Sequence, residues 1–166
     1  IVTATDVSAE LVLTTASAVE QGSDHPLALA IVRRAQGLSI PTQNGFENIE
    51  GMGARAQIDG ETVFLGNRRL MDSQKFDLGA LATDAQRLQG AGRTVVHVAR
   101  GGKVIGLIAI ADAVRPTAAA TVAKLRERGI KVAMLTGDNA GTAQRIGRDL
   151  GLDIEADVIG ADAGHD

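Results

Sequence analysis

A group of polar and glycine residues in the first half of the sequence has the types that a purine site needs. Its members are Glu20, His25, Gly51, Gly53 and Asn67. A carboxylate can accept a hydrogen bond from an exocyclic amine, an imidazole can stack or bond, and residues without a side chain let a flat ring approach the backbone. Singly, each residue also has an ordinary structural explanation, such as a helix end or a turn. Together they predict a purine site that uses no aromatic ring.

A second group follows an apolar run in the last third of the sequence, where Leu135 precedes Thr136-Gly137-Asp138-Asn139. Ligands of open α/β sheets bind at the carboxyl ends of strands, and a hydroxyl beside the amides of a helix start suits an oxyanion. The alternative is a plain helix cap, in which Asp138 or Asn139 accepts backbone amides. From position alone, a phosphate site and a cap both stay open.

Several other chemistries are excluded by missing or misplaced motifs. Residues 51–56 formally match the dinucleotide-binding fingerprint, but they lead into a predicted strand rather than a helix. Gly102-Lys103 lacks the upstream glycine of a phosphate-binding loop. The sequence has no Cys and three scattered His, of which His97 alternates within a predicted strand. Thiol chemistry and a metal site are therefore not expected, and His97 is expected to be an ordinary core or surface residue.

Composition narrows the class of protein further. The 166 residues carry a net charge of -3 and only 2% aromatic residues, which excludes a basic or base-stacking surface for nucleic acid. The longest apolar run, residues 104–111, is far shorter than the roughly 20 residues of a membrane helix. The first residues do not resemble a signal peptide, and we expect a soluble, monomeric piece of a longer protein.

Residues 1–112 predict an α+β domain, an antiparallel sheet flanked by helices. The predicted helices are two within residues 8–37, then 67–73 and 80–89. The predicted strands are 46–49, 54–58, 62–65, 94–99 and 104–110. Asp59-Gly60 and Gly101-Gly102 are expected to turn two hairpins. Ser8 is expected to cap the first helix, and Ser23 or Asp24 the second.

Residues 113–166 predict part of a Rossmann-like α/β domain. A helix over 116–128, an apolar strand over 130–135 and a helix ending at Leu150 follow one another. This order is half of a doubly wound α/β unit, so a domain boundary is expected near residues 112–115.

Motifs in a fixed order run through residues 20–150. They are Glu20, Gly22-Ser23-Asp24-His25-Pro26-Leu27, Gly51-x-Gly53, Gly66-Asn67-Arg68, Asp112-x-x-Arg115-Pro116 and Met134-Leu135-Thr136-Gly137-Asp138-Asn139. The series resembles the heavy-metal-transporting P-type ATPases, whose Ser-Glu-His-Pro-Leu signature is similar to the second motif.

The resemblance implies a role for some of the matching residues. Those of the adenine site in the nucleotide-binding domain would be Glu20, His25, Gly51, Gly53 and Asn67. Asp112 and Arg115 would lie at the hinge to the phosphorylation domain and would take part in binding the nucleotide. Thr136, Gly137 and Asp138 would face the transferred phosphoryl group and its Mg²⁺, in a segment with a haloacid-dehalogenase-like fold.

The resemblance also implies the setting of the chain. ATP would be the bound nucleotide, with Mg²⁺ in the complete enzyme. The partners would be the remaining phosphorylation, actuator and transmembrane domains of a pump in the plasma membrane. Copper is the expected cargo, with zinc or cadmium open, because the metal is chosen by membrane helices that this chain does not contain.

Departures from the family pattern limit the chemistry. The chain contains neither Asp-Lys-Thr-Gly-Thr, whose aspartate is phosphorylated, nor the Gly-Asp-Gly-x-Asn-Asp segment that would hold Mg²⁺. Asp24 replaces the usual Glu, Ala54 stands where a larger aliphatic residue is common, and the likeness ends after about Ile154. We therefore expect the chain to bind nucleotide without turning it over.

Two other functions are kept as alternatives. A haloacid-dehalogenase-like phosphatase remnant would rest on Thr136-Gly137-Asp138, although the Asp-x-Asp nucleophile pair is missing. A non-catalytic nucleotide sensor would keep the purine pocket without the chemistry. An open reading frame that continues upstream into Asp-Lys-Thr-Gly-Thr and membrane spans would decide against the sensor.

Overall fold

The computed structural model describes residues 1–23, 25–111, 116–136, 140–153 and 158–160. The chain divides into two compact units. One comprises Ile1–Ala85 with Val95–Ile110, and the other comprises Gln86–Thr94 with Ala111–Asp166. Each unit is considered by itself.

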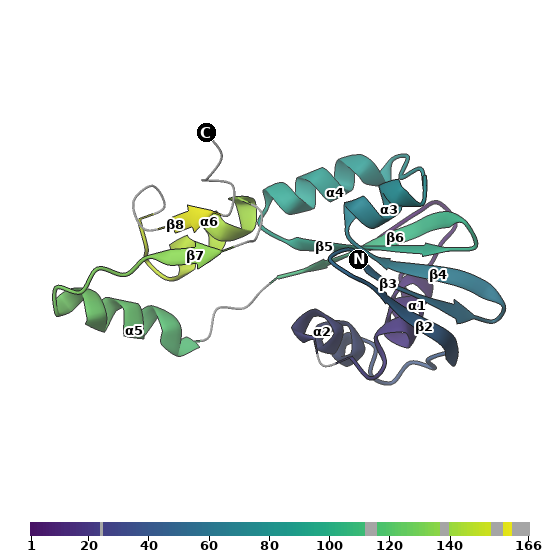
Figure 1. Ribbon diagram of the computed structural model, residues 1–166, viewed down its shortest axis with the longest axis horizontal. Helices are drawn as coiled ribbons and strands as arrows, with labels where there is room; N and C mark the ends of the chain where they lie inside the picture. The colour runs from purple at the N-terminus through teal and green to yellow at the C-terminus, as the bar shows by residue number, and fades with distance from the viewer. Residues whose placement is uncertain (24, 112–115, 137–139, 154–157, 161–166) are drawn as a thin grey trace. The chain divides into compact units, whose positions relative to one another are not determined.

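The first unit is built on a sheet with the strand order β1-β6-β5-β4-β3-β2 (Figure 1). Its strands are β1 (Val2–Thr3), β2 (Gln43–Ile49), β3 (Gly53–Ile58), β4 (Glu61–Gly66), β5 (Thr94–Arg100) and β6 (Lys103–Ile110). The strand pairs β1–β6, β2–β3, β3–β4 and β4–β5 are antiparallel. The predicted strands are confirmed, and β1 is an addition too short to show a pattern in the sequence.

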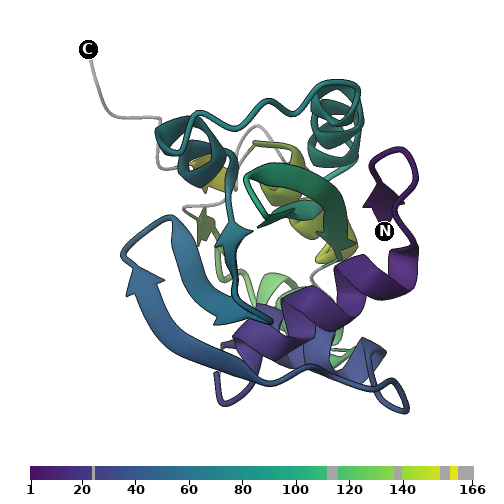
Figure 2. The same ribbon diagram turned by 90° about the vertical axis from the view of Figure 1, so that its right-hand side faces the viewer.

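Helices cover both faces of this sheet. They are α1 (Ala9–Glu20), α2 (Pro26–Arg34) and α3 (Arg68–Ser73), while the residues of α4 (Leu81–Gly90) are divided between the two units. In both ribbon views α1 and α2 lie on one side of the sheet and α3 on the other (Figures 1 and 2). Val12 and Val19 of α1 and Ile31 of α2 join one buried cluster with Ala56 of β3 and Val98 of β5. The predicted α+β fold is therefore confirmed.

Both predicted hairpins turn on residues with positive φ. Asp59 and Gly60 have φ of 52° and 79°, and Gly101 and Gly102 have φ of 58° and 80°. Positive φ at both central residues matches the right-handed twist of the flanking strands, which is why Asp-Gly and Gly-Gly favour hairpins.

The second unit contains a β-α-β arrangement. Besides the end of α4 and the first residue of β5, this unit contains α5 (Pro116–Glu127), β7 (Met134–Thr136), α6 (Ala140–Asp149) and β8 (Val158–Gly160). Strands β7 and β8 are parallel, as the predicted α/β unit requires. The predicted strand over 130–135 was wrong at its start. Pairing with β8 spans only Met134 to Thr136, so residues 130–133 form no strand pairing in the described structure.

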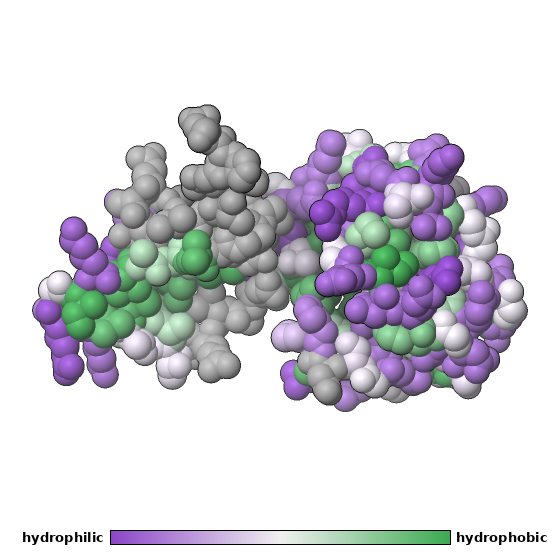
Figure 3. Space-filling model, viewed as in Figure 1, coloured by the Kyte–Doolittle hydropathy of each residue, from purple (hydrophilic) through white to green (hydrophobic). Residues whose placement is uncertain are grey.

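Hydrophobic surface is visible on the second unit (Figure 3). Ile130 and Leu135 are 48% and 79% exposed, whereas Ala143 and Leu152 are buried.

No helix within the described ranges combines the length and hydropathy of a membrane span.

Candidate functional site

The segment between α1 and α2 places Glu20 and His25 at two neighbouring helix ends. His25 caps α2, because its Nδ1 accepts a hydrogen bond from the Leu27 amide at 3.2 Å. The predicted cap at Ser23 or Asp24 was wrong: Asp24 lies outside the described residues, and Ser23 accepts from the His25 amide instead. Pro26 explains the difference, since a residue before proline is held extended, which is the conformation of an N-cap.

The capping bond determines how the His25 ring meets a ligand. A neutral imidazole whose Nδ1 accepts carries its proton on Nε2. The His25 side chain is exposed, so Nε2–H is available as a donor. One ring nitrogen therefore serves the fold, and the other is open to solvent or to a bound molecule.

Glu20 is a partly buried carboxyl at the last residue of α1. Burial raises the pKa of Glu20, while a hydrogen bond from the Ser23 side chain acts in the opposite direction. Among the described residues, no Lys or Arg forms a salt bridge with Glu20. Its carboxylate is thus a partly desolvated acceptor whose hydrogen-bond donor is the Ser23 side chain, and its remaining lone pairs can accept a further N–H donor.

Gly51 lies in a tight turn between β2 and β3. The Met52 amide donates to the Ile49 carbonyl at 3.0 Å, and Gly51 has a φ of 67°. A positive φ at the third residue of a four-residue turn is typical of type II turns and favours glycine. The residue type at position 51 is therefore explained by the turn itself.

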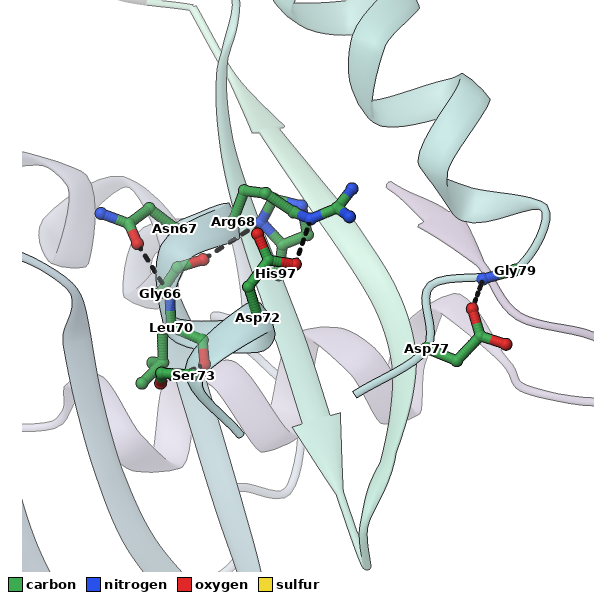
Figure 4. A network of polar contacts seen from close by, with 9 residues as sticks. All are labelled: Gly66, Asn67, Arg68, Leu70, Asp72, Ser73, Asp77, Gly79 and His97. Carbon is green, nitrogen blue, oxygen red and sulfur yellow. Dashed lines mark hydrogen bonds and ion pairs between the residues drawn. The ribbon is translucent and has the colours of Figure 1, made fainter. Parts of the chain in front are cut away.

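Asn67 connects this turn to α3. Its Oδ1 accepts from the Leu70 amide at 3.1 Å and caps α3, while its Nδ2 donates to the Gly51 carbonyl at 2.9 Å (Figure 4 shows the cap). The backbone N–H of Asn67 also donates to the Met52 carbonyl at 2.9 Å. Both ends of the Asn67 side chain are used within the protein, so Asn67 acts on the site by holding the turn.

Gly53 and Gly66 face each other in the β3–β4 pair. A Cβ at Gly53 would lie 2.1 Å from the Leu65 carbonyl oxygen, and one at Gly66 would lie 2.1 Å from the Met52 carbonyl oxygen. The missing side chain of Gly53 therefore makes room for the protein's own backbone. Gly66 belongs to the same close contact. Its motif was noted in the sequence, but its pairing with Gly53 could not be read there.

His97 of β5 lies in the core beneath Gly66 (Figure 4). Its Nδ1 lies 3.2 Å from the Gly66 carbonyl oxygen, and its Nε2 is buried without a hydrogen-bond partner. Burial is the main cause that lowers the pKa of His97, and it favours a neutral ring whose Nδ1–H donates to Gly66. The expectation of a core or surface role is confirmed as a core role.

The structure thus groups the predicted residues of the first half into two sets. One is Glu20 with His25, and the other is the Gly51–Gly53 turn with Asn67. Within the described structure, no hydrogen bond or ion pair links one set to the other. Sequence reasoning missed Arg69, whose Nη2 donates to the Gly51 carbonyl at 2.8 Å. No sequence signal reveals a contact between residues 18 positions apart on different elements.

Most of the residues predicted to bind the phosphates lie outside the described part of the structure. Thr136 is the last residue of β7. The remaining predicted residues, Asp112, Arg115, Gly137 and Asp138, lie outside the described residues. In the part of the chain that is described, no three His, Asp or Glu side chains gather as metal ligands do.

Comparison with known proteins decides the family. A profile of the haloacid dehalogenase-like hydrolases matches residues 2–164. The chain belongs to this family. It is also homologous to heavy-metal P-type ATPases, as the ordered motifs predicted. It is 44% identical over 91% of its length to the probable copper-exporting P-type ATPase V of Mycobacterium tuberculosis, of which it spans 20%.

Solved structures agree with this placement of the haloacid dehalogenase-like chain. A zinc-transporting PIB-type ATPase in the E2.Pi state is 40% identical, with a TM-score of 0.72 over 96% of this chain and 25% of that one. The N-domain of HMA8, a copper-transporting P-type ATPase, is 35% identical with a TM-score of 0.55. That match covers 66% of this chain and 96% of the N-domain.

Proposed function

We propose that this chain binds ATP as the nucleotide-binding part of a heavy-metal-transporting P-type ATPase. The observation that carries the proposal is the Glu20 carboxyl, which is partly desolvated and lacks a salt bridge in the described structure, beside the exposed His25 ring. Likeness to nearly the whole of an N-domain from a copper-transporting P-type ATPase supports the same assignment.

Glu20 and His25 would recognise the purine. A carboxylate accepts from the exocyclic amine of adenine, whereas guanine presents a carbonyl oxygen at that position and would be repelled. The Nε2–H of His25 can donate to a ring nitrogen, or the imidazole face can stack on the base. Preference for adenine over guanine is therefore the expected signature.

The turn at Gly51 would form the opposite wall of the purine pocket. Its peptide is braced by Asn67, so the backbone is set before the ligand arrives. A preformed wall binds more tightly than one that must be ordered on binding. Gly53, whose space is taken by the Leu65 carbonyl, would contribute by letting β3 and β4 approach each other at this point.

In the complete protein, the phosphates would be bound by residues that come later in the chain than those that bind the base. Asp112 and Arg115 would help to bind the nucleotide at the hinge to the phosphorylation domain. Thr136, Gly137 and Asp138 would face the γ-phosphoryl group. Mg²⁺ would arrive with the phosphates and would need ligands from the rest of the protein. Because the chain contains no Asp-Lys-Thr-Gly-Thr, it would bind ATP without hydrolysing it.

The complete protein would hydrolyse ATP to export a heavy metal across the plasma membrane, with this chain on the cytoplasmic side. Actuator, phosphorylation and transmembrane domains would be its covalent partners. Copper is the first choice of cargo, given the 44% identity to a probable copper exporter. Zinc is the second, given the 40% identity to a zinc transporter.

An NMR titration tests nucleotide binding directly. The sequence has no Trp or Tyr, so amide shifts report better than intrinsic fluorescence. ATP, ADP and AMP should all shift the amides of Glu20, His25, Gly51, Gly53 and Asn67, with and without Mg²⁺. GTP should bind more weakly, and His25→Ala should weaken ATP binding.

The same titration separates the alternatives. Shifts confined to the amides around Thr136 would favour a phosphatase remnant. Binding of adenine nucleotides by a gene product that lacks an upstream Asp-Lys-Thr-Gly-Thr and membrane spans would favour a sensor. No shift with any nucleotide would contradict the proposed purine site.

A further inference from the structure

We propose that Arg69 is a positioning residue of the nucleotide site, whose guanidinium fixes the Gly51 carbonyl and with it the wall of the purine pocket. This inference rests on the proposed function. Arg69 stands on α3, outside every motif that pointed to the site.

The peptide that joins Gly51 to Met52 is held at both of its polar groups. Its carbonyl accepts from Asn67 Nδ2 at 2.9 Å and from Arg69 Nη2 at 2.8 Å. Its N–H donates to the Ile49 carbonyl at 3.0 Å. A carbonyl oxygen has two lone pairs, so the two donors saturate it. The peptide plane cannot rotate unless at least one of these bonds breaks.

The turn needs such a brace because glycine imposes little conformation of its own. Gly51 has access to both signs of φ, and without a constraint the turn would sample several conformations. Arg69 Nη2 lies 3.5 Å from the place where a Cβ of Gly51 would be. The guanidinium therefore covers the open side of the glycine as well as bonding its carbonyl.

Arg69 is committed to this contact rather than to a surface ion pair. No described carboxylate forms a salt bridge with it, and a charged donor makes a stronger hydrogen bond than a neutral amide. Its neighbour Arg68 differs, since Arg68 Nε pairs with Asp72 at 2.7 Å along α3 (Figure 4). Two adjacent arginines on one helix thus have separate partners.

A positioning role predicts that the loss of affinity does not depend on the phosphates. Without Arg69 the turn must be ordered when the base binds, and part of the binding free energy is spent on that ordering. We expect Arg69→Ala to weaken binding of adenosine, AMP and ATP by the same factor, roughly tenfold. Arg69→Lys retains a charged donor and should recover part of the loss.

The experiment measures dissociation constants of the full chain for adenosine, AMP and ATP by NMR titration. The variants are Arg69→Ala, Arg69→Lys and the matched control Arg68→Ala, which removes the neighbouring charge and should bind as the unaltered chain does. In the free proteins, amide exchange of Met52 should be faster in Arg69→Ala than in Arg68→Ala. Unchanged shifts of β5 and β6 amides show that each variant is folded.

Three results would overturn the inference. Equal affinities for Arg69→Ala and the unaltered chain would remove Arg69 from the site and leave the proposed function intact. A loss that grows from adenosine to ATP would make Arg69 a direct phosphate ligand instead. If the unaltered chain binds none of the three compounds, the proposed function itself fails, and Arg69 has no site to position.

Discussion

A carboxyl that is partly buried without a salt-bridge partner lowers the stability of the protein that carries it, and Glu20 fits this description in the described structure. Because burial raises its pKa in the folded state, the ionised form is penalised by folding. Such a residue is retained at the expense of stability when a ligand uses it, as perturbed groups at functional sites often are.

Glu20→Gln should therefore raise the melting temperature of the ligand-free chain at pH 7 while weakening ATP binding several-fold. The Glu20 penalty is full above the folded-state pKa and vanishes as pH falls below the unfolded value near 4.5. The stability advantage of the variant should shrink over that range. Thermal unfolding of both proteins between pH 7 and pH 4 measures it, and an advantage that does not change with pH would contradict the argument.

His25 combines a structural and a binding role in one ring, and two substitutions separate them. His25→Ala removes both, with a loss of about 1 kcal/mol of stability from the missing cap and weaker ATP binding. Asparagine is a good N-cap residue, so His25→Asn should recover most of the stability but not the affinity. Chemical denaturation and titration on the same samples give both quantities. Recovery of ATP affinity in His25→Asn would show that the ring matters only as a cap.

At the scale of elements, the β3–β4 pair depends on a close backbone approach at Gly53. A Cβ there would lie 2.1 Å from the Leu65 carbonyl oxygen, and the φ of Gly53 is 143°. Gly53→Ala should destabilise the chain by at least about 2 kcal/mol, because strands and not flexible side chains must move. Urea denaturation measures the change.

Gly90 provides the matched control for this substitution. It ends α4, and apart from its chain neighbours and the backbone of its own helix, no atom of the described residues lies within 4 Å of the position that its Cβ would take. Gly90→Ala should stabilise the chain by about 0.5–1 kcal/mol, since alanine loses less backbone entropy in a helix. If Gly53→Ala changed the free energy of unfolding as little as Gly90→Ala does, the backbone near Gly53 would have to relax easily, which would contradict the prediction.

Several elements were predictable because local chemistry decides them. The Asp59-Gly60 and Gly101-Gly102 turns have the residue types that hairpins require. In β3, which precedes the first of these turns, alternation of residue type determines which side chains face the core. Met134–Thr136 was not delimited correctly, because a strand ends where its pairing partner ends, and β8 is far along the chain. The cap of α2 was also missed, since proline outweighed the usual preference for serine or aspartate.

At the scale of the whole molecule, the two units differ in how much they bury. The first unit has a large buried cluster that joins α1 and α2 to the sheet and includes Val98, and α3 also buries Leu70. In the second unit, β7 pairs with β8 alone in the described structure, and Leu135 of β7 is 79% exposed. Stability against local opening follows buried apolar contacts.

Hydrogen exchange should therefore be faster in residues 113–166 than in residues 8–111. We expect amides of β4 and β5 to be protected to the level of global unfolding, and those of α5 and α6 to exchange through local opening at least tenfold faster. Exchange followed by NMR at neutral pH measures this. Uniform protection across both ranges would show that the two units unfold as one.

Residue types and spacing by themselves predicted the fold class and most of the helices and strands, because these depend on patterns that each segment carries alone. The ordered motifs gave a resemblance to the heavy-metal P-type ATPases, and comparison with known proteins showed the homology. The set of candidate ligands, Glu20, His25, Gly51, Gly53 and Asn67, was also present in the sequence. The tertiary structure decided what those residues do within the protein: His25 caps a helix, Asn67 holds a turn, and Gly53 admits a neighbouring strand. It also brought Arg69 to the Gly51 carbonyl, because contacts between distant elements arise only when sheet and helices pack together.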